Sequence, residues 1–255
     1  MELKNKTILI TGGGSGIGLE AVKQFLENGC KVIITGRNQE KLDNAKKLFP
    51  SITTFNSDVA NAENAKKLLS QIEALGGIDI LYNNAGVISK PQNLGISNDK
   101  HYETAEYEIN INYLGVIRLN NLFMEMLKSK KESAIINTAS ILSYVPLNLS
   151  PTYSASKVAV RFYTESLRNH LQLLNSNVKV FELSPPLVAT AMADGIEAKA
   201  MSPEKLVNAL IKGLKNNNYK IRVGDTKAIY FLSRFLPKIA WGLLNQKENA
   251  KQLQN

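Results

Sequence analysis

A tyrosine and a lysine stand four residues apart in the stretch PTYSASKVAV, and together they could carry acid–base chemistry. Tyr153 and Lys157 lie near the start of a segment with a helical pattern, so their side chains share one face of the expected helix. A free phenol has a pKa of about 10 and exchanges protons poorly at neutral pH. A nearby ammonium group favours the phenolate, so we expect Lys157 to lower the pKa of Tyr153 towards the range of a general acid and base.

A serine that follows a strand-like stretch could join this chemistry. Ser140 ends the sequence IINTAS, and its hydroxyl could hydrogen-bond the same substrate oxygen as Tyr153. The alternative is a strand-end serine whose hydroxyl is satisfied by the backbone. A tyrosine and a lysine at this spacing also occur by chance, so the elements that position them decide what the pair means.

A glycine-rich turn, TGGGSGIG at residues 11–18, is the second chemical signal. Glycines allow positive φ angles and let backbone N–H groups approach a pyrophosphate, which the N-terminus of the following helix stabilises. An apolar β-branched run precedes this turn and a helical pattern follows it, as a dinucleotide site requires. We therefore expect cofactor binding rather than a merely flexible turn. The expected contacts come from Thr11, Gly12, Gly14, Ser15, Gly16, Ile17 and Gly18.

The elements that must position these residues alternate along the chain. Short β-branched runs predict strands at residues 7–11, 31–35, 52–56, 78–84, 134–139, 178–183 and 219–223. Amphipathic segments predict helices near residues 17–28, 39–48, 61–75, 99–128, 154–174 and 203–217. This order predicts one α/β domain over residues 1–255, with a Rossmann-like doubly wound parallel sheet and helices on both faces. In such sheets ligands bind beyond the carboxyl ends of the strands.

The end of the second predicted strand is the usual place where a dinucleotide site distinguishes NAD from NADP. An acidic residue there accepts from the ribose 2′-hydroxyl of NAD, whereas a basic residue suits the 2′-phosphate of NADP. The sequence reads VIITGRNQEK and offers Arg37 and Asn38, with no acid at residues 35–38. We therefore expect NADP(H), with NAD as the alternative, in which case Arg37 is a solvated loop charge.

Two residues after the third predicted strand could bind the adenine. The Asp58 carboxylate could accept a hydrogen bond from the adenine amino group while Val59 packs on the ring. The alternative is that Asp58 caps the next helix, and both roles can hold together.

Five ordered motifs together resemble the short-chain dehydrogenase/reductase family over residues 5 to about 190. They are TGGGSGIG, NNAG at residues 83–86, Asn112 in NYLGV, Ser140, and Tyr153-SAS-Lys157. The glycine spacing and the chain length resemble the short single-domain branch of that family. The resemblance implies hydride transfer between a nicotinamide and a carbonyl or alcohol carbon.

The resemblance also implies a role for each catalytic residue. Tyr153 would donate a proton to the carbonyl oxygen during reduction and take it back during oxidation. Lys157 would lower the pKa of Tyr153 and bind the nicotinamide ribose, and Ser140 would position the oxygen. Asn112 would hold a helix backbone and a water in a proton relay. The segment with Asn83, Asn84, Ala85 and Gly86 would stabilise the sheet and border the adenosine ribose.

The sequence departs from the family pattern after the sixth predicted strand. A Pro-Gly pair is usual there, whereas this chain has Pro185 and Pro186, which stiffen the turn and remove an N–H group. Thr190 still matches the residue that contacts the nicotinamide carboxamide, so we expect Pro185, Val188 and Thr190 at the cofactor. The stretches ELSPPLVAT and MSPEKLVNALIKGL resemble the DltE-type subgroup, and this resemblance assigns no substrate.

Two segments are expected to enclose the substrate. Residues 141–152 separate Ser140 from Tyr153 and are largely apolar, and residues 191–217 are the expected lid. Neither segment offers a paired-arginine clamp for a carboxylate, so we expect an uncharged, partly hydrophobic carbonyl or alcohol substrate. The alternative is that residues 141–149 simply cover the core.

The positive charge of the chain is concentrated near its C-terminus. The chain has 31 basic and 22 acidic residues, of which residues 199–255 contribute 11 and 3. Residues 225–255 interleave these cations with aromatic and apolar side chains. Three interpretations stay open: packing within the subunit or in a homodimer or homotetramer, lining of the substrate pocket, and docking to an anionic membrane surface.

Composition narrows the remaining function classes. A hydrophobic fraction of 44% and a charged fraction of 21% disfavour disorder. The lone Cys30 and the absence of a signal-peptide pattern favour a cytoplasmic protein, and the apolar stretch 228–244 is too interrupted for a transmembrane helix. His101 and His170 suggest no metal site, and no nucleic-acid motif accompanies the charge.

These observations together predict an NADP(H)-dependent oxidoreductase. The alternative is a cofactor-binding sensor or scaffold protein of the cell envelope with little turnover. The joint presence of Ser140, Tyr153 and Lys157 favours the enzyme, because a pure binding module does not need all three.

Overall fold

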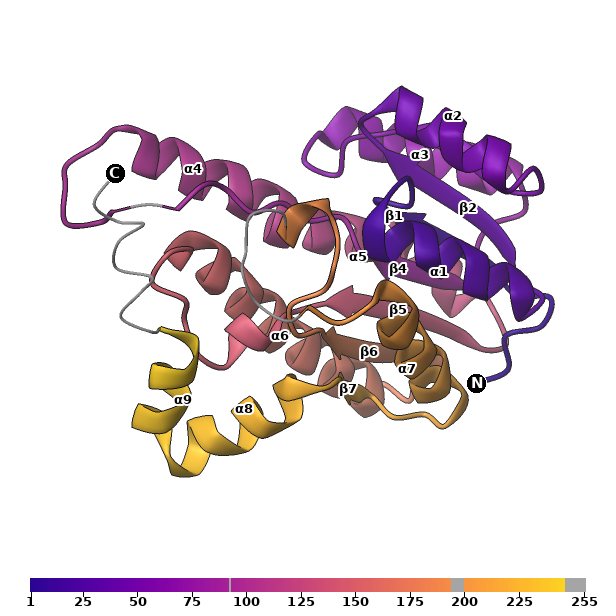
Figure 1. The fold of residues 1–255 in the computed structure, drawn as a ribbon. Helices are drawn as coiled ribbons and strands as arrows, with labels where there is room; N and C mark the ends of the chain where they lie inside the picture. Colours follow the sequence, from indigo (N-terminus) through magenta and orange to yellow (C-terminus); the bar gives the residue numbers. More distant parts are fainter. Residues whose placement is uncertain (92, 194–199, 246–255) are drawn as a thin grey trace.

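A seven-stranded parallel sheet runs through the described part of the computed structural model, which comprises residues 1–91, 93–193 and 200–245. The strand order is β3-β2-β1-β4-β5-β6-β7, so the direction of winding reverses between β1 and β4. Figure 1 shows this sheet between two layers of helices. The strands are β1 (Thr7–Thr11), β2 (Lys31–Gly36), β3 (Thr53–Asn56), β4 (Ile80–Asn83), β5 (Ser133–Thr138), β6 (Val178–Ser184) and β7 (Lys220–Arg222).

Helices cover both faces because successive strand residues point to opposite sides. Ile8 and Ile10 of β1 pack on one face with α1, α2 and α7, whereas Leu9 packs on the other face with α3, α5 and α6. The helices are α1 (Gly16–Glu27), α2 (Gln39–Leu48), α3 (Ala62–Ala74), α4 (Lys100–Ile109), α5 (Gly115–Lys128), α6 (Pro151–Leu173), α7 (Pro203–Lys215), α8 (Asp225–Phe235) and α9 (Pro237–Leu244). The predicted α/β architecture is confirmed.

One predicted helix is confirmed in extent but contains an irregular turn. The helix expected over residues 99–128 is divided into α4, a π-helix (Asn110–Leu114) and α5. A hydrophobic pattern does not register one wider turn within a continuous helical run, and such π-turns are frequent at functional sites. The C-terminal segment, for which no secondary structure was predicted, forms α8 and α9.

Helix α7 belongs to the core rather than to a cover over the site. Leu206, Val207, Leu210 and Leu214 are fully buried, and this helix packs against α1. A lid within the expected range of 191–217 is therefore confined to residues before 203, and residues 194–199 of that range lie outside the described residues.

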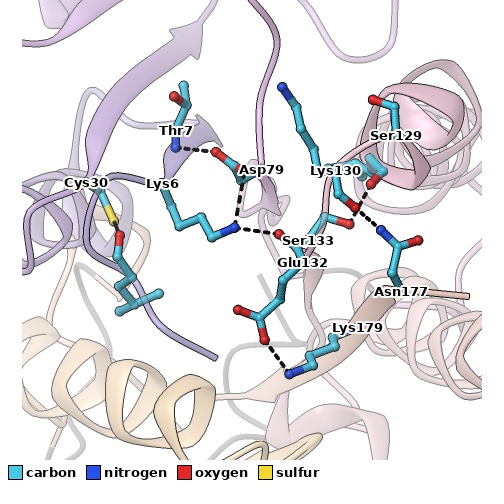
Figure 2. Close-up of polar contacts among 12 residues, drawn as sticks. Lys6, Thr7, Cys30, Asp79, Ser129, Lys130, Glu132, Ser133, Asn177 and Lys179 are labelled. Atoms are coloured by element: carbon cyan, nitrogen blue, oxygen red, sulfur yellow. Dashed lines mark hydrogen bonds and ion pairs between the residues drawn. The ribbon is translucent and has the colours of Figure 1, made fainter.

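Ion pairs tie the strands together at the amino edge of the sheet (Figure 2). The Lys6 ammonium donates to the Asp79 carboxylate at 3.3 Å and to the backbone oxygen of Glu132 at 2.7 Å. Asp79 also accepts from the backbone N–H of Thr7, and Lys179 pairs with Glu132 at 2.6 Å. These contacts join the starts of β1, β4, β5 and β6, while the cleft described below lies at the opposite edge.

Candidate active site

A cleft of about 590 Å³ opens at the carboxyl ends of β1, β2 and β4, beside the reversal of strand order. Its walls come from the glycine-rich turn, the ends of β2 and β3, and the loop after β4. Most residues expected to bind a dinucleotide line it: Gly12, Gly14, Ser15, Gly16, Ile17, Arg37, Asn38, Asp58, Val59, Asn84, Ala85, Gly86 and Thr190. The position agrees with the rule for ligands of open α/β sheets.

The glycine-rich turn has the backbone geometry of an anion cradle. Gly16 begins α1 with a φ of +53°, in the left-handed region that favours glycine. A Cβ on Gly18 would lie only 2.2 Å from the backbone oxygen of Gly12, so this turn has room only for glycine at position 18. Ser15 makes no side-chain cap, and the first-turn N–H groups of α1 therefore have no capping partner from it. These features fit the pyrophosphate of a dinucleotide.

Thr11 supports the cleft from behind rather than lining it. Its buried Oγ1 accepts hydrogen bonds from the backbone N–H groups of Asn84 at 3.0 Å and Ala85 at 2.9 Å. The Asn84 side chain in turn donates to the backbone oxygen of Thr11 at 3.0 Å. The glycine-rich turn and the loop after β4 are thus fixed to one another.

Arg37 lines the cleft just after β2, where the adenosine ribose is expected. Its guanidinium donates to the Tyr107 hydroxyl at 2.9 Å and lies 3.9 Å from the Asp58 carboxylate. The hydrogen bond to Tyr107 raises the pKa of Arg37, although partial burial opposes this. Lys41, which sequence analysis missed, also lines the cleft. Asn38 caps α2 by accepting from the N–H of Lys41 at 2.9 Å.

Asp58 is not the cap of the following helix. The N-cap of α3 is Asn61, whose side chain accepts from the N–H of Asn64 at 2.9 Å. The Asp58 carboxylate instead accepts from the N–H of Ala60 at 2.9 Å and leaves its second oxygen beside Arg37. Val59 is buried against Gly115 and also lines the cleft, so the two positions expected to meet adenine both face it.

The structure brings Ser140, Tyr153 and Lys157 together. Ser140 follows β5, and its Oγ accepts from the N–H of Leu142 at 3.1 Å. This is the backbone contact of the alternative interpretation, but it uses only the acceptor side and leaves the hydroxyl proton to be donated. Lys157 is 4% exposed. Its ammonium lies 5.6 Å from the centre of the Tyr153 ring and donates to the backbone oxygen of Thr138 at 3.0 Å.

The expectation that Lys157 lowers the pKa of Tyr153 is wrong for this chain. Burial raises the pKa of Tyr153 to about 12; a hydrogen bond with Ser140 lowers it and the Glu108 carboxylate raises it further. Burial also lowers the pKa of Lys157 to about 8. The lysine sits over the face of the ring, and its own burial disfavours the charge that would stabilise a phenolate.

Asn112 lies inside the π-helix and is completely buried. Its Oδ1 accepts from the N–H of Val87 at 2.8 Å, and its Nδ2 donates to the oxygen of Val87 at 2.9 Å and to the Ser156 hydroxyl at 3.1 Å. One acceptor and two donors are therefore occupied, so the side chain serves as a brace between the loop after β4 and α6. The wider π-turn brings this side chain into contact with Ser156 of α6. The hydrophobic pattern of the sequence predicts a helix here but does not show the π-turn.

Glu108 is a functional candidate that sequence analysis missed. This carboxylate at the end of α4 is 1% exposed; it accepts from the N–H of Ser89 at 2.7 Å and from the hydroxyl of Thr152, which directly precedes Tyr153. A glutamate within an amphipathic helix normally indicates a solvated face, so no signal in the sequence marked it.

A buried polar network fixes the expected substrate wall, residues 141–152. The Tyr144 hydroxyl donates to the Glu182 carboxylate at 3.0 Å and accepts from Arg222 at 2.9 Å. Burial raises the pKa of Tyr144 and the Glu182 charge raises it further, while Ser184 and Arg222 oppose the change. Ile141 and Val145 pack against α8 and α9, so this segment both follows Ser140 and covers a small core.

The turn after β6 is only partly directed at the cleft. Thr190 lines it and lies beside Gly16, whereas Val188 is buried in the core. Pro185 accepts a hydrogen bond from the N–H of Ile141 at 2.8 Å and so joins this turn to the residue after Ser140. Val188 and Pro185, which were expected at the cofactor, are therefore not among the residues that line the cleft and instead support the turn. Ala191 and Met192, from the expected lid, also line the cleft. Residues not foreseen from sequence line it as well: Thr35, Gly36, Lys41, Leu42, Ser57, Val87, Ile88, Tyr107 and Ile111.

Two further findings concern other function classes. Within residues 1–91, 93–193 and 200–245, no group of three or more His, Cys, Asp or Glu side chains is arranged to hold a metal ion. In the same ranges no helix combines the length and the apolar character needed to cross a bilayer.

Cys30 is buried, its thiol donates to the oxygen of Leu3, and burial raises its pKa to about 12.

Comparison with known proteins agrees with this geometry. Residues 6–200 match the short chain dehydrogenase family. The uncharacterized oxidoreductase DltE of Bacillus subtilis (strain 168) is 34% identical over 228 residues, which are 87% of this chain and 89% of that protein.

Solved structures share the fold over nearly the whole chain. A short chain dehydrogenase from Burkholderia cenocepacia J2315 in complex with NADP has a TM-score of 0.84 and 26% identity, covering 96% of this chain and 99% of that one. A short chain dehydrogenase/reductase from Burkholderia phymatum in complex with NAD has a TM-score of 0.82 and 22% identity, covering 93% and 95%.

Proposed function

This chain belongs to the short-chain dehydrogenase family, and from that premise we propose that it is an NADP(H)-dependent oxidoreductase with Tyr153 as its general acid and base. Membership makes it an NAD(P)-dependent dehydrogenase or reductase. The bound nicotinamide supplies or accepts the hydride at a carbonyl or alcohol carbon. The residues of the chain bind the cofactor, orient the substrate oxygen and move its proton.

The observation that carries the proposal is the junction of cleft and catalytic residues at Gly86. Gly86 lines the cleft, and a Cβ on it would lie 3.4 Å from the Lys157 ammonium and 3.3 Å from Oδ1 of Asn112. A ligand in the cleft therefore extends towards the side chains expected to perform the chemistry. A pure binding module does not require this continuity.

The protonation states favour reduction at neutral pH. With a pKa raised to about 12, the Tyr153 phenol holds its proton and can donate it to a carbonyl oxygen. The Ser140 hydroxyl, already accepting from Leu142, would hold the same oxygen by donation. Lys157, with a pKa of about 8, can exchange a proton near neutrality and so restore the phenol. Oxidation needs the phenolate and should accelerate as pH rises.

The NADP preference rests on two cations at the adenosine end. Arg37 and Lys41 both line the cleft, and the Asp58 carboxylate lies 3.9 Å from the Arg37 guanidinium. A 2′-phosphate would take the place of Asp58 as the partner of Arg37. Fluorescence titration should give tighter binding of NADPH than of NADH, and tighter NADH binding would overturn the preference. Arg37→Gln should weaken NADPH binding by about tenfold, whereas Lys47→Gln, at an exposed position near the end of helix α2, should leave NADPH binding unchanged.

The activity itself is tested with a panel of carbonyl and alcohol compounds. With the wild-type chain present, uncharged and partly hydrophobic carbonyl compounds should be reduced, and the absorbance of NADPH should fall as NADPH is oxidised. Inactivity across the panel with intact cofactor binding would contradict the enzyme and favour a cofactor-binding sensor or scaffold.

We propose further that residues 1–255 act as one domain, that Ala191 and Met192 begin a cover over the cleft, and that the chain forms a homodimer or homotetramer. Ala191 and Met192 line the cleft beside Thr190, which supports the cover. Exposed aromatic side chains such as Phe162 on α6 support self-association. The lone buried Cys30 is compatible with a reducing cytoplasm. Light scattering during size-exclusion chromatography measures the oligomer.

A further inference from the structure

The two C-terminal helices present apolar side chains to solvent. Helices α8 and α9 extend from the β7 edge, at the end of the molecule remote from α2 and α3 (Figure 1). Six large apolar residues on or between them are between 47% and 75% exposed: Phe231, Phe235, Leu236, Ile239, Trp241 and Leu243. We call these six side chains the outer apolar face. Exposed apolar side chains gathered on neighbouring helical turns indicate an interaction surface.

The inner side of the same helices is already packed. Ile229 and Ala240 are buried against Ile141 and Val145, with Leu232 beside them. The outer apolar face is therefore not needed to attach α8 and α9 to the sheet. It must be explained by something outside the described part of the chain.

Cations border the outer apolar face. Lys227, Arg234 and Lys238 lie within or between the two helices, where Asp225 is the single acid. Arg234 stacks on the Tyr230 ring at 5.2 Å. Among the described residues Lys227 makes no ion pair, so its charge remains available to an external anion.

A small hollow beside the same face is also basic. It measures about 220 Å³, lies between β7 and α8, and is lined without any carboxylate. Its walls are Asn218, Lys220, Arg222, Lys227, Tyr230 and Phe231. Lys220 pairs with Glu165 at 2.6 Å, and Arg222 is held 3.8 Å from the centre of the Tyr230 ring. Phe231 belongs both to the hollow and to the outer apolar face, so the two features are continuous.

From this juxtaposition we propose that α8 and α9 dock the protein onto an anionic lipid bilayer. The outer apolar face enters the boundary between headgroups and acyl chains, and Lys227, Arg234 and Lys238 meet the anionic headgroups. The basic hollow accepts a headgroup phosphate beside Phe231. Aromatic side chains such as Trp241 suit this boundary, since they have an apolar body and a polar edge.

Charge disfavours a second copy of the chain as the occupant. A twofold symmetric contact through the outer apolar face would bring each cation of one copy close to cations of the other. The chain carries a net charge of +9, which adds long-range repulsion between copies. An anionic bilayer instead complements these charges, and this proposal does not depend on the catalytic assignment.

The test is cosedimentation of the full chain with lipid vesicles. Equimolar phosphatidylcholine and phosphatidylglycerol vesicles should pellet the protein at low salt, whereas pure phosphatidylcholine vesicles should not. Raised salt should release much of the bound protein because it screens the cations. No pelleting with the anionic vesicles at low salt would overturn the proposal.

Paired variants separate the apolar and the ionic contributions. Phe235→Ser/Ile239→Ser and Arg234→Gln/Lys238→Gln should each reduce vesicle affinity by about tenfold or more. The apolar control is Leu173→Ser/Leu174→Ser at the end of α6, where both leucines are more than 70% exposed. The charge control is Lys47→Gln/Lys67→Gln on α2 and α3. Both controls should bind vesicles like the wild type, and equal losses in controls and test variants would contradict a specific surface.

Two further readouts keep the result unambiguous. Thermal melting must show that each variant remains folded, as its exposed positions lead us to expect. If Phe235→Ser/Ile239→Ser instead lowers the oligomer mass in light scattering and the wild type ignores anionic vesicles, the outer apolar face is an interface between copies and the membrane proposal is wrong.

Discussion

Burial acts in opposite directions on the two ionisable side chains at the centre of the site. It raises the pKa of Tyr153 to about 12 and lowers that of Lys157 to about 8, because each loses hydration of its charged form. Both changes favour neutral side chains, so at neutral pH a protonated phenol lies next to an ammonium group that loses its proton more readily than a free lysine. A protonated phenol is what the proposed reduction of a carbonyl compound requires.

The first prediction concerns Tyr153→Phe. Loss of the hydroxyl removes the proposed proton donor but retains the ring, so turnover should fall by at least about 100-fold while the dissociation constant for NADPH stays within about twofold. Steady-state kinetics and fluorescence titration measure the two quantities. Tyr102→Phe, the same change at an exposed position on α4, is the control, and normal turnover in Tyr153→Phe would refute the role.

The second prediction concerns the stability cost of Lys157. Below pH 8 its ammonium is charged in both the folded and the unfolded chain, and the folded chain bears the whole cost of burial. As pH rises from about 8 towards 10.5, the folded chain has released the proton and the unfolded chain retains it, so wild-type stability from this group rises.

Lys157→Met, which keeps the volume but not the charge, should therefore raise the free energy of unfolding at pH 7 by about 1 to 3 kcal/mol. Its advantage over the wild type should shrink by pH 9.5 or so, within the window given by the pKa of Lys157. Urea denaturation at the two pH values tests this. A variant that is less stable than the wild type at both would show that the hydrogen bond to Thr138 outweighs the burial of charge.

At the scale of elements, two local backbone features shape the cleft. The π-helix of Asn110–Leu114 lets a single buried amide join the loop after β4 to α6. The glycine-rich turn brings the start of α1 so close to the backbone of Gly12 that Gly18 has no room for a side chain. Both features connect a strand end to a helix that carries functional residues.

The third prediction tests the turn with Gly18→Ala. The added methyl would approach the backbone oxygen of Gly12 at 2.2 Å, and because this atom belongs to the backbone the turn itself must move. We expect NADPH affinity to fall by at least about tenfold and stability to fall by about 1 to 3 kcal/mol. Gly242→Ala is the control, since among the described residues a Cβ there would meet no atom within 4 Å beyond its chain neighbours and its own helix backbone, and it should be neutral or slightly stabilising. Unchanged cofactor affinity in Gly18→Ala would contradict the cradle.

At the scale of the molecule, the C-terminal helices have two sides with different physical roles. Their inner side packs under the segment that follows Ser140, through Ile141 and Val145. Their outer apolar face and the neighbouring cations contact no other part of the described chain that would bury them. The same pair of helices therefore supports the expected substrate wall and offers a surface for docking.

The fourth prediction separates these two sides. Ile229→Ala should lower the free energy of unfolding by about 2 to 4 kcal/mol, because Ile229 is 4% exposed and the change leaves a cavity behind the substrate wall. Phe235→Ser should change it by no more than about 0.5 kcal/mol. Chemical denaturation compares the two. A large loss in Phe235→Ser would mean that the outer side is part of the core.

Sequence patterns predict the parallel sheet, the glycine-rich turn and the three candidate catalytic residues Ser140, Tyr153 and Lys157. These features depend on local signals: β-branched runs, glycine conformational freedom, and a fixed spacing along one helix. Strand and helix boundaries differ from prediction by only a few residues, because the apolar pattern continues into the turns.

The burial and the charged neighbours of those residues depend on how the whole chain folds. The raised pKa of Tyr153, the buried carboxylate of Glu108 and the second cation Lys41 arise from segments distant in the chain that meet at the cleft. Val188 was predicted to contact the cofactor but lies in the core, for the same reason. The burial and the pKa of a side chain depend on every residue that lies near it in the fold. A sequence pattern shows only which residues are near it along the chain.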